Sequence, residues 1–302
     1  MKYRLLLSFI FLLAIKNVAA QSTPSVVVSI KPIHSIVTSL MNGIAEPQLL
    51  LKSNNSAHTF HLKPSQVQMI ANADLIIIIS EDFESGLRKA IKNIEDDSLF
   101  QIISLNNLII HKSRSEIFKS KEHKGADEHE DNIYDLHLWL DINNMKLIAK
   151  HINNLLIKID PVNEDKYNNN FLELMLDLEE LKIDLEKEID PFLASQFAVF
   201  SDTTQYFEKS MKLIRPIIIT PYHGARLSII RTLMAKQAMS DLSVSCLLYG
   251  QEAKPNQISV LSEGLSLKTF EIDILGTKYP TGPDQYFNLM KRISSQLASC
   301  LK

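Results

Sequence analysis

The chain has 302 residues, of which 45% are hydrophobic and 22% are charged, and it contains 8 glycines and 11 prolines. This composition excludes collagen-like, low-complexity and disordered chains and is typical of a globular protein with room for two domains. The formal net charge of −3 gives no basic excess, so nucleic acid is not a predicted partner.

The first twenty residues have the pattern of a secretory signal peptide. Lys2 and Arg4 precede an apolar run over 5–15, and small residues at 18–20 suit a cleavage site. The run is too short to span a bilayer comfortably, and no later stretch approaches twenty apolar residues. We therefore expect an exported protein that is cleaved after Ala20, with an uncleaved anchor as the alternative.

Short β-rich runs alternate with helical patterns in the next part of the chain. Strands are predicted at 26–30, 49–51 and 74–80. Helices are predicted after the first strand, through Leu40 to a stop at Asn42 and Gly43, and from Pro64 onward. The last of these strands is continuously apolar, which is typical of a strand covered on both faces. The β-α-β-α-β order predicts a parallel sheet whose ligands lie beyond the carboxyl ends of its strands.

The pattern breaks over 111–131, where charged residues dominate and large apolar residues are nearly absent. We expect a mobile surface loop there. Residues 135–141 then alternate strictly between leucines and other residues, which predicts a strand. The face opposite the leucines carries Asp135, His137, Trp139 and Asp141.

Two helices follow, one over 142–159 and a longer one over 163–189 with apolar residues every three or four positions. A helix of that length is about 40 Å long, which is enough to bridge two domains. Beyond it, strands are predicted at 196–200, 216–219, 243–248 and 267–272, alternating with helices. The predicted division is a signal peptide at 1–20, an N-terminal α/β lobe at 21–162, a linking helix at 163–190 and a C-terminal α/β lobe at 191–302.

The chain contains only two cysteines, Cys246 and Cys300. In an oxidising compartment an even pair favours a disulfide, and two separate buried thiols are the alternative. A zinc site built on cysteine is disfavoured, because a disulfide would use both thiols.

Histidine is the remaining candidate for site chemistry, because the sequence lacks the common hydrolase, phosphate-loop and dinucleotide-binding motifs. His58 lies between a strand and a predicted helix, with His61 three residues later, and His137 shares a strand face with two carboxylates. Asp273 closes the last predicted strand of the other lobe. Neutral imidazoles with a carboxylate suit a borderline cation such as Zn²⁺. Structural roles for these side chains are the alternative, since no two of them form a local metal motif.

Several segments, in a fixed order, carry a resemblance to a known family. They read SIKPIHSI, AHTFHLKPSQ, ANADLIII, DLHLWLD, YFEK, VSCLL, DILGT and ASCLK. From about Val26 to Lys302 the chain resembles the periplasmic zinc-binding proteins of ABC importers, the ZnuA type of metal-binding solute-binding protein. The resemblance implies two Rossmann-like α/β lobes with mostly parallel sheets, a long rigid linking helix, and a metal cleft between the lobes.

The same resemblance implies a function in transport. A protein of this type captures Zn²⁺ in the periplasm and delivers it to a membrane permease that a cytoplasmic ATPase drives. We therefore expect a monomer without catalysis, without a catalytic substrate and without nucleic acid as a partner. By position, the resemblance assigns the metal ligands His58, His137 and Asp273, and a disulfide between Cys246 and Cys300.

The family's third histidine has no counterpart, because Ser201 stands at its place in the segment SDTTQYF. A neutral hydroxyl is a poor zinc ligand beside imidazole. Water, a shift of Asp202 or Asp273, or a further histidine such as His61 is expected to complete the site. We hypothesise an open site of two imidazoles, Asp273 and water, with a lower affinity than in relatives.

Three other functions stay open. The metal can be another divalent ion such as manganese, or the chain can be a degenerate relative with weak or no metal binding that serves as an adhesin or scaffold. It can also be a secreted metallohydrolase in which Asp135 or Asp141 acts beside a metal-bound water, although neither residue belongs to a recognisable catalytic motif.

Overall fold

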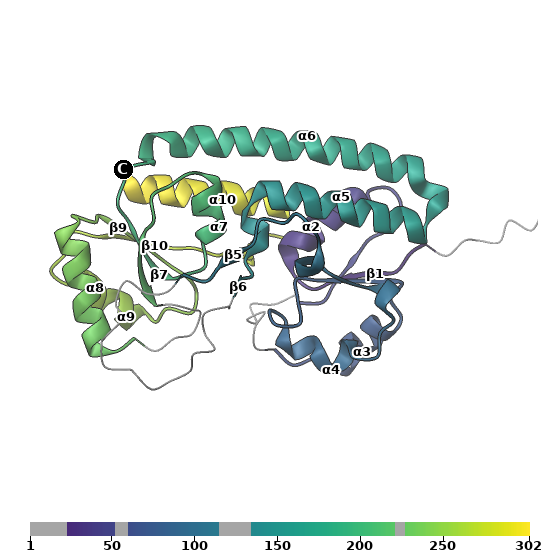
Figure 1. Ribbon diagram of the computed structural model, residues 1–302, viewed down its shortest axis with the longest axis horizontal. Coiled ribbons are helices and arrows are strands. Elements are labelled where there is room, and N and C mark those ends of the chain that lie inside the picture. Colours follow the sequence, from purple (N-terminus) through teal and green to yellow (C-terminus); the bar gives the residue numbers. More distant parts are fainter. Residues whose placement is uncertain (1–22, 52–59, 115–133, 221–226) are drawn as a thin grey trace, which may run out of the picture.

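A computed structural model of the protein describes residues 23–51, 60–114, 134–220 and 227–302. The segment predicted as a signal peptide lies outside these residues, as do His58 and positions 115–133 of the chain. Within them the protein is an α/β structure with two parallel sheets, as the sequence predicts (Figure 1). We refer to the described residues before the long helix α6 (Glu164–Ile189) as the N-terminal lobe and to those after it as the C-terminal lobe.

The sheet of the N-terminal lobe has the strand order β2-β1-β3-β4, and every neighbouring pair is parallel. Its strands are β1 (Val26–Val28), β2 (Gln48–Leu49), β3 (Leu75–Ile78) and β4 (Leu99–Gln101). The helices of this lobe are α2 (Lys31–Leu40), α3 (Pro64–Ala71), α4 (Arg88–Ile91) and α5 (Ile142–Ile159). All residues of β1 and β3 are buried, which explains why both strands are continuously apolar.

The sheet of the C-terminal lobe is also parallel and has the order β10-β9-β7-β8. Its strands are β7 (Ala198–Ser201), β8 (Ile217–Thr220), β9 (Cys246–Tyr249) and β10 (Lys268–Glu271). Its helices are α7 (Gln205–Ser210), α8 (Ile229–Asp241), α9 (Pro255–Ser262) and α10 (Gln285–Leu301). Both α3 and α9 begin at a proline, where the missing N–H is not needed by the helix.

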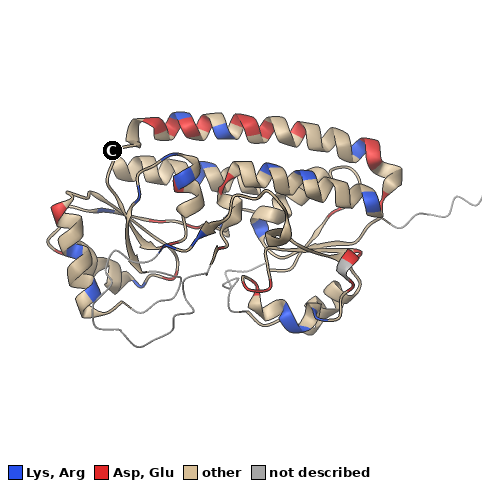
Figure 2. Ribbon diagram, viewed as in Figure 1, with Lys and Arg blue, Asp and Glu red and all other residues tan. Residues whose placement is uncertain are grey.

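Helix α6 runs along one side of the molecule and passes over both lobes (Figure 1). It packs against α2 and α5 of the N-terminal lobe and against α10 of the C-terminal lobe. Its buried face consists of Tyr167, Asn170, Leu174, Leu178, Leu181, Leu185 and Ile189. Acidic residues gather on the rest of the helix (Figure 2), so its exposed surface is well solvated.

One continuous apolar core extends through both lobes. It includes Val27 of β1, Leu178 of α6, Leu289 of α10 and Leu248 of β9. A second core fills the space between the C-terminal sheet and the pair α8 and α9. The two lobes therefore share buried apolar surface as well as a connecting helix, which resists large relative motion.

The lobes are also joined by hydrogen bonds. Three side chains of the N-terminal lobe donate to backbone carbonyls of the segment 274–283. The bonds run from Trp139 Nε1 to Ile274 O (2.8 Å), from Lys31 Nζ to Thr277 O (2.8 Å) and from Ser35 Oγ to Pro283 O (2.6 Å). The segment that follows Asp273 is thus held against the other lobe.

The strand predicted over 135–141 is wrong. Strand β6 covers only Tyr134–Asp135, and Leu138–Leu140 forms a 3-10 helix. The reason is local: the carboxylate of Asp135 accepts a hydrogen bond from the backbone N–H of His137 at 3.0 Å, which turns the chain out of the strand. Leu138, Trp139 and Leu140 are all fully buried, so the alternation reflects burial on every side rather than a pleated face.

The start of the predicted 111–131 loop is ordered. Strand β5 (His111–Lys112) pairs with β6 in an antiparallel register, and Arg114 is buried in ion pairs with Asp202 and Glu208. The correction concerns 111–114, since the rest of the predicted loop lies outside the described residues.

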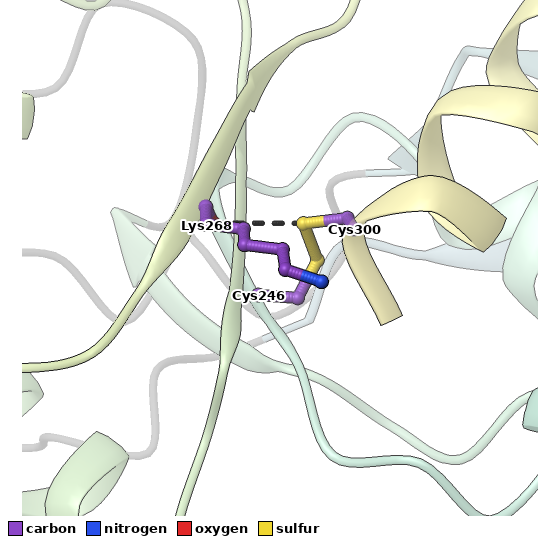
Figure 3. The surroundings of a disulfide bond; sticks show 3 residues. All are labelled: Cys246, Lys268 and Cys300. Carbon is purple, nitrogen blue, oxygen red and sulfur yellow. Dashed lines mark hydrogen bonds between the residues drawn. A yellow bond between two sulfur atoms is a disulfide. The ribbon is translucent and has the colours of Figure 1, made fainter. Parts of the chain in front are cut away.

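The predicted disulfide between Cys246 and Cys300 is confirmed. It joins β9 to the last turn of α10, with a Cα–Cα distance of 5.2 Å (Figure 3). Because α10 packs on α6 and α2, the bond ties the C-terminal sheet to the helices shared by both lobes. In the part of the chain that the structure describes, no helix is both long and apolar enough to cross a membrane.

Candidate metal site

The sequence-predicted ligands lie just beyond strand ends. Ser201 is the last residue of β7, Asp273 follows β10 by two residues, and His137 follows β6 by two residues. Two hydrogen bonds bring these segments together: Trp139 Nε1 donates to Ile274 O, and Gln205 Nε2 donates to Asp135 Oδ2 at 3.1 Å. The predicted site therefore occupies the junction of the two lobes.

His137 is the best-defined candidate ligand. Its side chain is buried, with 8% of the residue exposed, and Nδ1 lies 2.7 Å from Oδ1 of Asp135. With the carboxylate as acceptor, Nδ1 carries the hydrogen, and Nε2 is the nitrogen through which a metal ion would be coordinated. A carboxylate behind a histidine is the usual means of fixing ring orientation at metal sites.

The surroundings of Asp135, the carboxylate that holds His137, favour its ionised form. Burial raises the pKa of Asp135, but the adjacent His137 and the hydrogen bonds from His137 and Gln205 outweigh it, so the pKa is lowered overall. The rings of Phe83 and Trp139 pack edge-on against His137 at centroid distances of 5.8 and 5.4 Å. This apolar wall excludes water from one side of the imidazole and strengthens its electrostatic interactions.

Asp273 is oriented by its own loop. Its Oδ1 accepts from the N–H of Leu275 at 3.1 Å, and its Oδ2 accepts from Thr277 Oγ1 at 2.7 Å and from the N–H of Lys278 at 3.3 Å. Lys31 of the N-terminal lobe lies close by: burial lowers its pKa, and the charge of Asp273 opposes that effect. The carboxylate is therefore held in place at the contact between the lobes.

Ser201 is buried, with 3% of the residue exposed, and its hydroxyl donates to Oε1 of Glu252. Glu252 is the third residue after β9, the strand next to β7 in the sheet. No local sequence pattern marks Glu252 as a site residue. Its position beyond the carboxyl end of a parallel strand is the signal that could have identified it.

The carboxylate of Asp202 is already paired with the guanidinium of Arg114. Its Oδ2 accepts from the backbone N–H of Arg114 at 3.0 Å, and its Oδ1 accepts from Arg114 Nε at 2.9 Å. The same guanidinium also pairs with Glu208 at 2.5 Å. A metal ion at Asp202 would have to compete with this buried ion pair.

The remaining predicted residues are less defined. His61 is exposed ahead of α3, and His58 lies outside the described residues. Within the ranges that the structure describes, no three His, Cys, Asp or Glu side chains are grouped closely enough to hold a metal ion. The complete ligand set therefore stays a prediction that depends on the segment containing His58.

Comparisons with known proteins agree with the fold. Residues 26–300 match the family model described as "Zinc-uptake complex component A periplasmic" (ZnuA). The high-affinity zinc uptake system protein ZnuA of Brucella abortus is 27% identical over 311 aligned positions, which cover 91% of each chain.

Solved structures of ZnuA proteins have the same fold as this chain. A crystal structure of ZnuA superimposes with a TM-score of 0.75 and 18% identity, covering 93% of this chain and 100% of that one. A ZnuA deletion mutant with zinc bound superimposes with a TM-score of 0.76 and 18% identity, covering 93% and 99%. These matches establish the fold, and the family model extends over nearly all of the chain. The protein therefore belongs to the ZnuA family, and the resemblance found in its sequence is confirmed.

Proposed function

We propose that this protein is an extracytoplasmic solute-binding protein that captures Zn²⁺ between its lobes and delivers it to an ABC importer. Membership of the ZnuA family supports this function. The observation that carries it is the buried pair of His137 and Asp135, in which the carboxylate at 2.7 Å fixes the imidazole for coordination through Nε2.

The proposed ligands are His58, His137 and Asp273, with water or His61 as further donors. Two imidazoles and a carboxylate are a donor set that binds Zn²⁺ and leaves a position open. Asp202 fits this role less well, because both of its oxygens accept hydrogen bonds from Arg114. Histidine and carboxylate ligands also suit a carrier, since such a site can release its ion more readily than a closed four-cysteine site.

We propose that the protein acts in the periplasm as a monomer, after removal of a signal peptide ending at Ala20. Its lobes would correspond to residues 21–162 and 191–302, with 163–190 as the linking helix. Its partners would be the permease of an ABC importer and the cytoplasmic ATPase that drives it. The protein itself would bind and release its cargo without a catalytic step.

A zinc titration of the metal-stripped protein tests this function. We expect one Zn²⁺ per chain in the wild type and a loss of affinity of at least about tenfold in His137→Ala, because a buried first ligand is removed. His151→Gln is the matched control, since His151 lies on α5 and stacks on Phe100 at 4.5 Å. Unchanged zinc affinity in His137→Ala would refute the proposed site, and a wild type that binds little zinc would favour a degenerate relative.

A further inference from the structure

We propose that Glu252 is the metal ligand that the C-terminal lobe supplies in place of the missing histidine, and that Ser201 is its positioning residue. Among the described residues, Glu252, His137 and Asp273 are not grouped closely enough to share an ion, so metal binding would draw their loops together. This inference rests on the proposed function, because a ligand at this position is needed only if the site binds a metal. It adds a residue to the site that neither the sequence pattern nor family membership assigns.

The first support is the contact between Ser201 and Glu252. Ser201 occupies the position where the family pattern has an imidazole, and its hydroxyl donates to Oε1 of Glu252. The donor comes from β7 and the carboxylate from the loop after β9, and these strands are hydrogen-bonded neighbours. A carboxylate is thereby placed next to the point from which the missing side chain would have extended.

The second support is the order of the strands. β10, β9 and β7 lie side by side, so Glu252 follows the strand between the one that precedes Asp273 and the one that ends at Ser201. Neighbouring parallel strands are about 4.8 Å apart, which places these loops at one edge of the sheet. The loops also touch: Gln251 Nε2 donates to Thr277 Oγ1 at 3.3 Å, and the same hydroxyl donates to Asp273 Oδ2 at 2.7 Å.

The third support is Gly250, which makes room for the carboxylate. A Cβ atom at this position would lie 2.8 Å from Cδ of Glu252 and would overlap its Oε2. Gly250 has no positive φ, so its backbone conformation does not require glycine. The carboxylate end of Glu252 is the group that a side chain at position 250 would meet, so a larger residue there would shift that carboxylate.

The chemistry of Glu252 differs from that of its neighbour Asp202. Both oxygens of Asp202 accept hydrogen bonds from Arg114, whereas Oε1 of Glu252 accepts a hydrogen bond from the hydroxyl of Ser201, which orients the carboxylate. Two carboxylates, Glu252 and Asp273, would balance the charge of a divalent cation. Replacing an imidazole by a carboxylate also favours harder cations, so we expect this protein to discriminate less between Zn²⁺ and Mn²⁺ than a site with three histidines would.

Zinc affinities measured by chelator competition test the inference. We expect Glu252→Gln to lose at least about tenfold in zinc affinity, because an amide oxygen is a weaker ligand than a carboxylate. Glu263→Gln is the matched control: Glu263 is an exposed residue at the end of α9, and the change removes the same charge from the same lobe. Gly250→Ala should lose affinity as Glu252→Gln does, although it leaves every proposed ligand in the chain. Thermal unfolding verifies that each variant is folded.

Two further measurements separate coordination from a structural role. The visible spectrum of the Co²⁺-loaded protein should change in Glu252→Gln and stay as in the wild type in Glu263→Gln, because it reports the ligands of the metal. Ser201→Ala should weaken zinc binding in the wild-type background and have no further effect in Glu252→Gln, since Ser201 acts through Glu252.

The outcomes also distinguish this inference from the proposed function. If His137→Ala loses zinc while Glu252→Gln and Gly250→Ala bind it as the wild type does, the role of Glu252 is overturned and the proposed function stands. If His137→Ala itself binds zinc normally, the proposed function fails, and the role of Glu252 fails with it.

Discussion

Glu84 gives a quantitative prediction about stability. The residue follows β3 and is completely buried, and its carboxyl group joins the carboxyl ends of two strands. Oε1 accepts from Ser29 Oγ at 2.5 Å and from the N–H of Ile79 at 3.0 Å, and Oε2 accepts from the N–H of Ser80 at 3.0 Å. Burial raises the pKa of Glu84 from 4.5 to about 7, and these hydrogen bonds only partly oppose the shift.

The sign follows from proton binding. Between pH 4.5 and about pH 7 the folded state holds a proton on Glu84 that the unfolded state has lost. The stabilising effect of this group is therefore complete below pH 4.5 and disappears as the pH rises through about 7. A shift of this size corresponds to about 3 kcal/mol of unfolding free energy over that range.

Urea unfolding at a series of pH values measures this effect in the wild type and in Glu84→Gln. The variant stays neutral throughout, so its unfolding free energy should lack the fall of about 3 kcal/mol between pH 4.5 and 7. Its absolute stability should be lower at acid pH. The amide places an N–H group where the surrounding hydroxyl and backbone N–H groups are donors, so some of these hydrogen bonds are lost. The informative quantity is therefore the difference in slope, and parallel pH profiles would refute the reasoning.

Four other outcomes are expected. Arg114→Gln leaves two buried carboxylates without their counter-ion and should lower the unfolding free energy by about 3 kcal/mol or more in urea titrations; a loss typical of a surface ion pair would mean that the cluster is solvated. Replacing both cysteines by alanine should cost about 2–4 kcal/mol, and reductant should then have no effect on the melting temperature. Zinc affinity should decrease as the pH is lowered, because protons compete with the metal ion for its imidazole and carboxylate ligands, and an affinity that stays constant down to about pH 5 would argue against histidine ligands. Small-angle scattering should detect little change in the radius of gyration on zinc loading, since the lobes share a core, whereas a large decrease would indicate a freely hinged molecule.

The spacing of apolar residues along the sequence predicted most of the helices and strands, because that spacing reflects which face of each element is buried against its neighbours. The helix of 142–159 was predicted to the residue, and the buried face of α6 follows the apolar spacing of its sequence. Strands β4 and β5, of three and two residues, were not predicted, since so few residues contain no period. The segment 135–141 was misread because a side-chain to backbone hydrogen bond at Asp135 overrides the alternating pattern.

The sequence could propose ligands only where a local pattern marks them. His137 was proposed because it shares a predicted strand face with two carboxylates, and Asp273 because it closes a predicted strand; both assignments stay predictions. The partnership of Ser201 with Glu252 spans 51 residues, and that of Arg114 with Asp202 spans 88, so both depend on sheet pairing and loop packing that no local pattern records. Arg114 belongs to a segment whose charge predicts a solvated loop. Its side chain is nevertheless buried, because it forms ion pairs with the carboxylates of Asp202 and Glu208.

The contacts around the site also constrain how a cargo ion can leave. On one side, the segment 274–283 accepts hydrogen bonds from Trp139, Lys31 and Ser35 of the N-terminal lobe. On the other side, Gln205 and Tyr206 donate to Asp135, which in turn holds the His137 ring. A wide separation of the lobes would break both sets of hydrogen bonds, and each hydrogen bond contributes about 1 kcal/mol to stability. It would also expose the apolar core that the lobes share. Release by small shifts of the ligand-bearing loops avoids these losses.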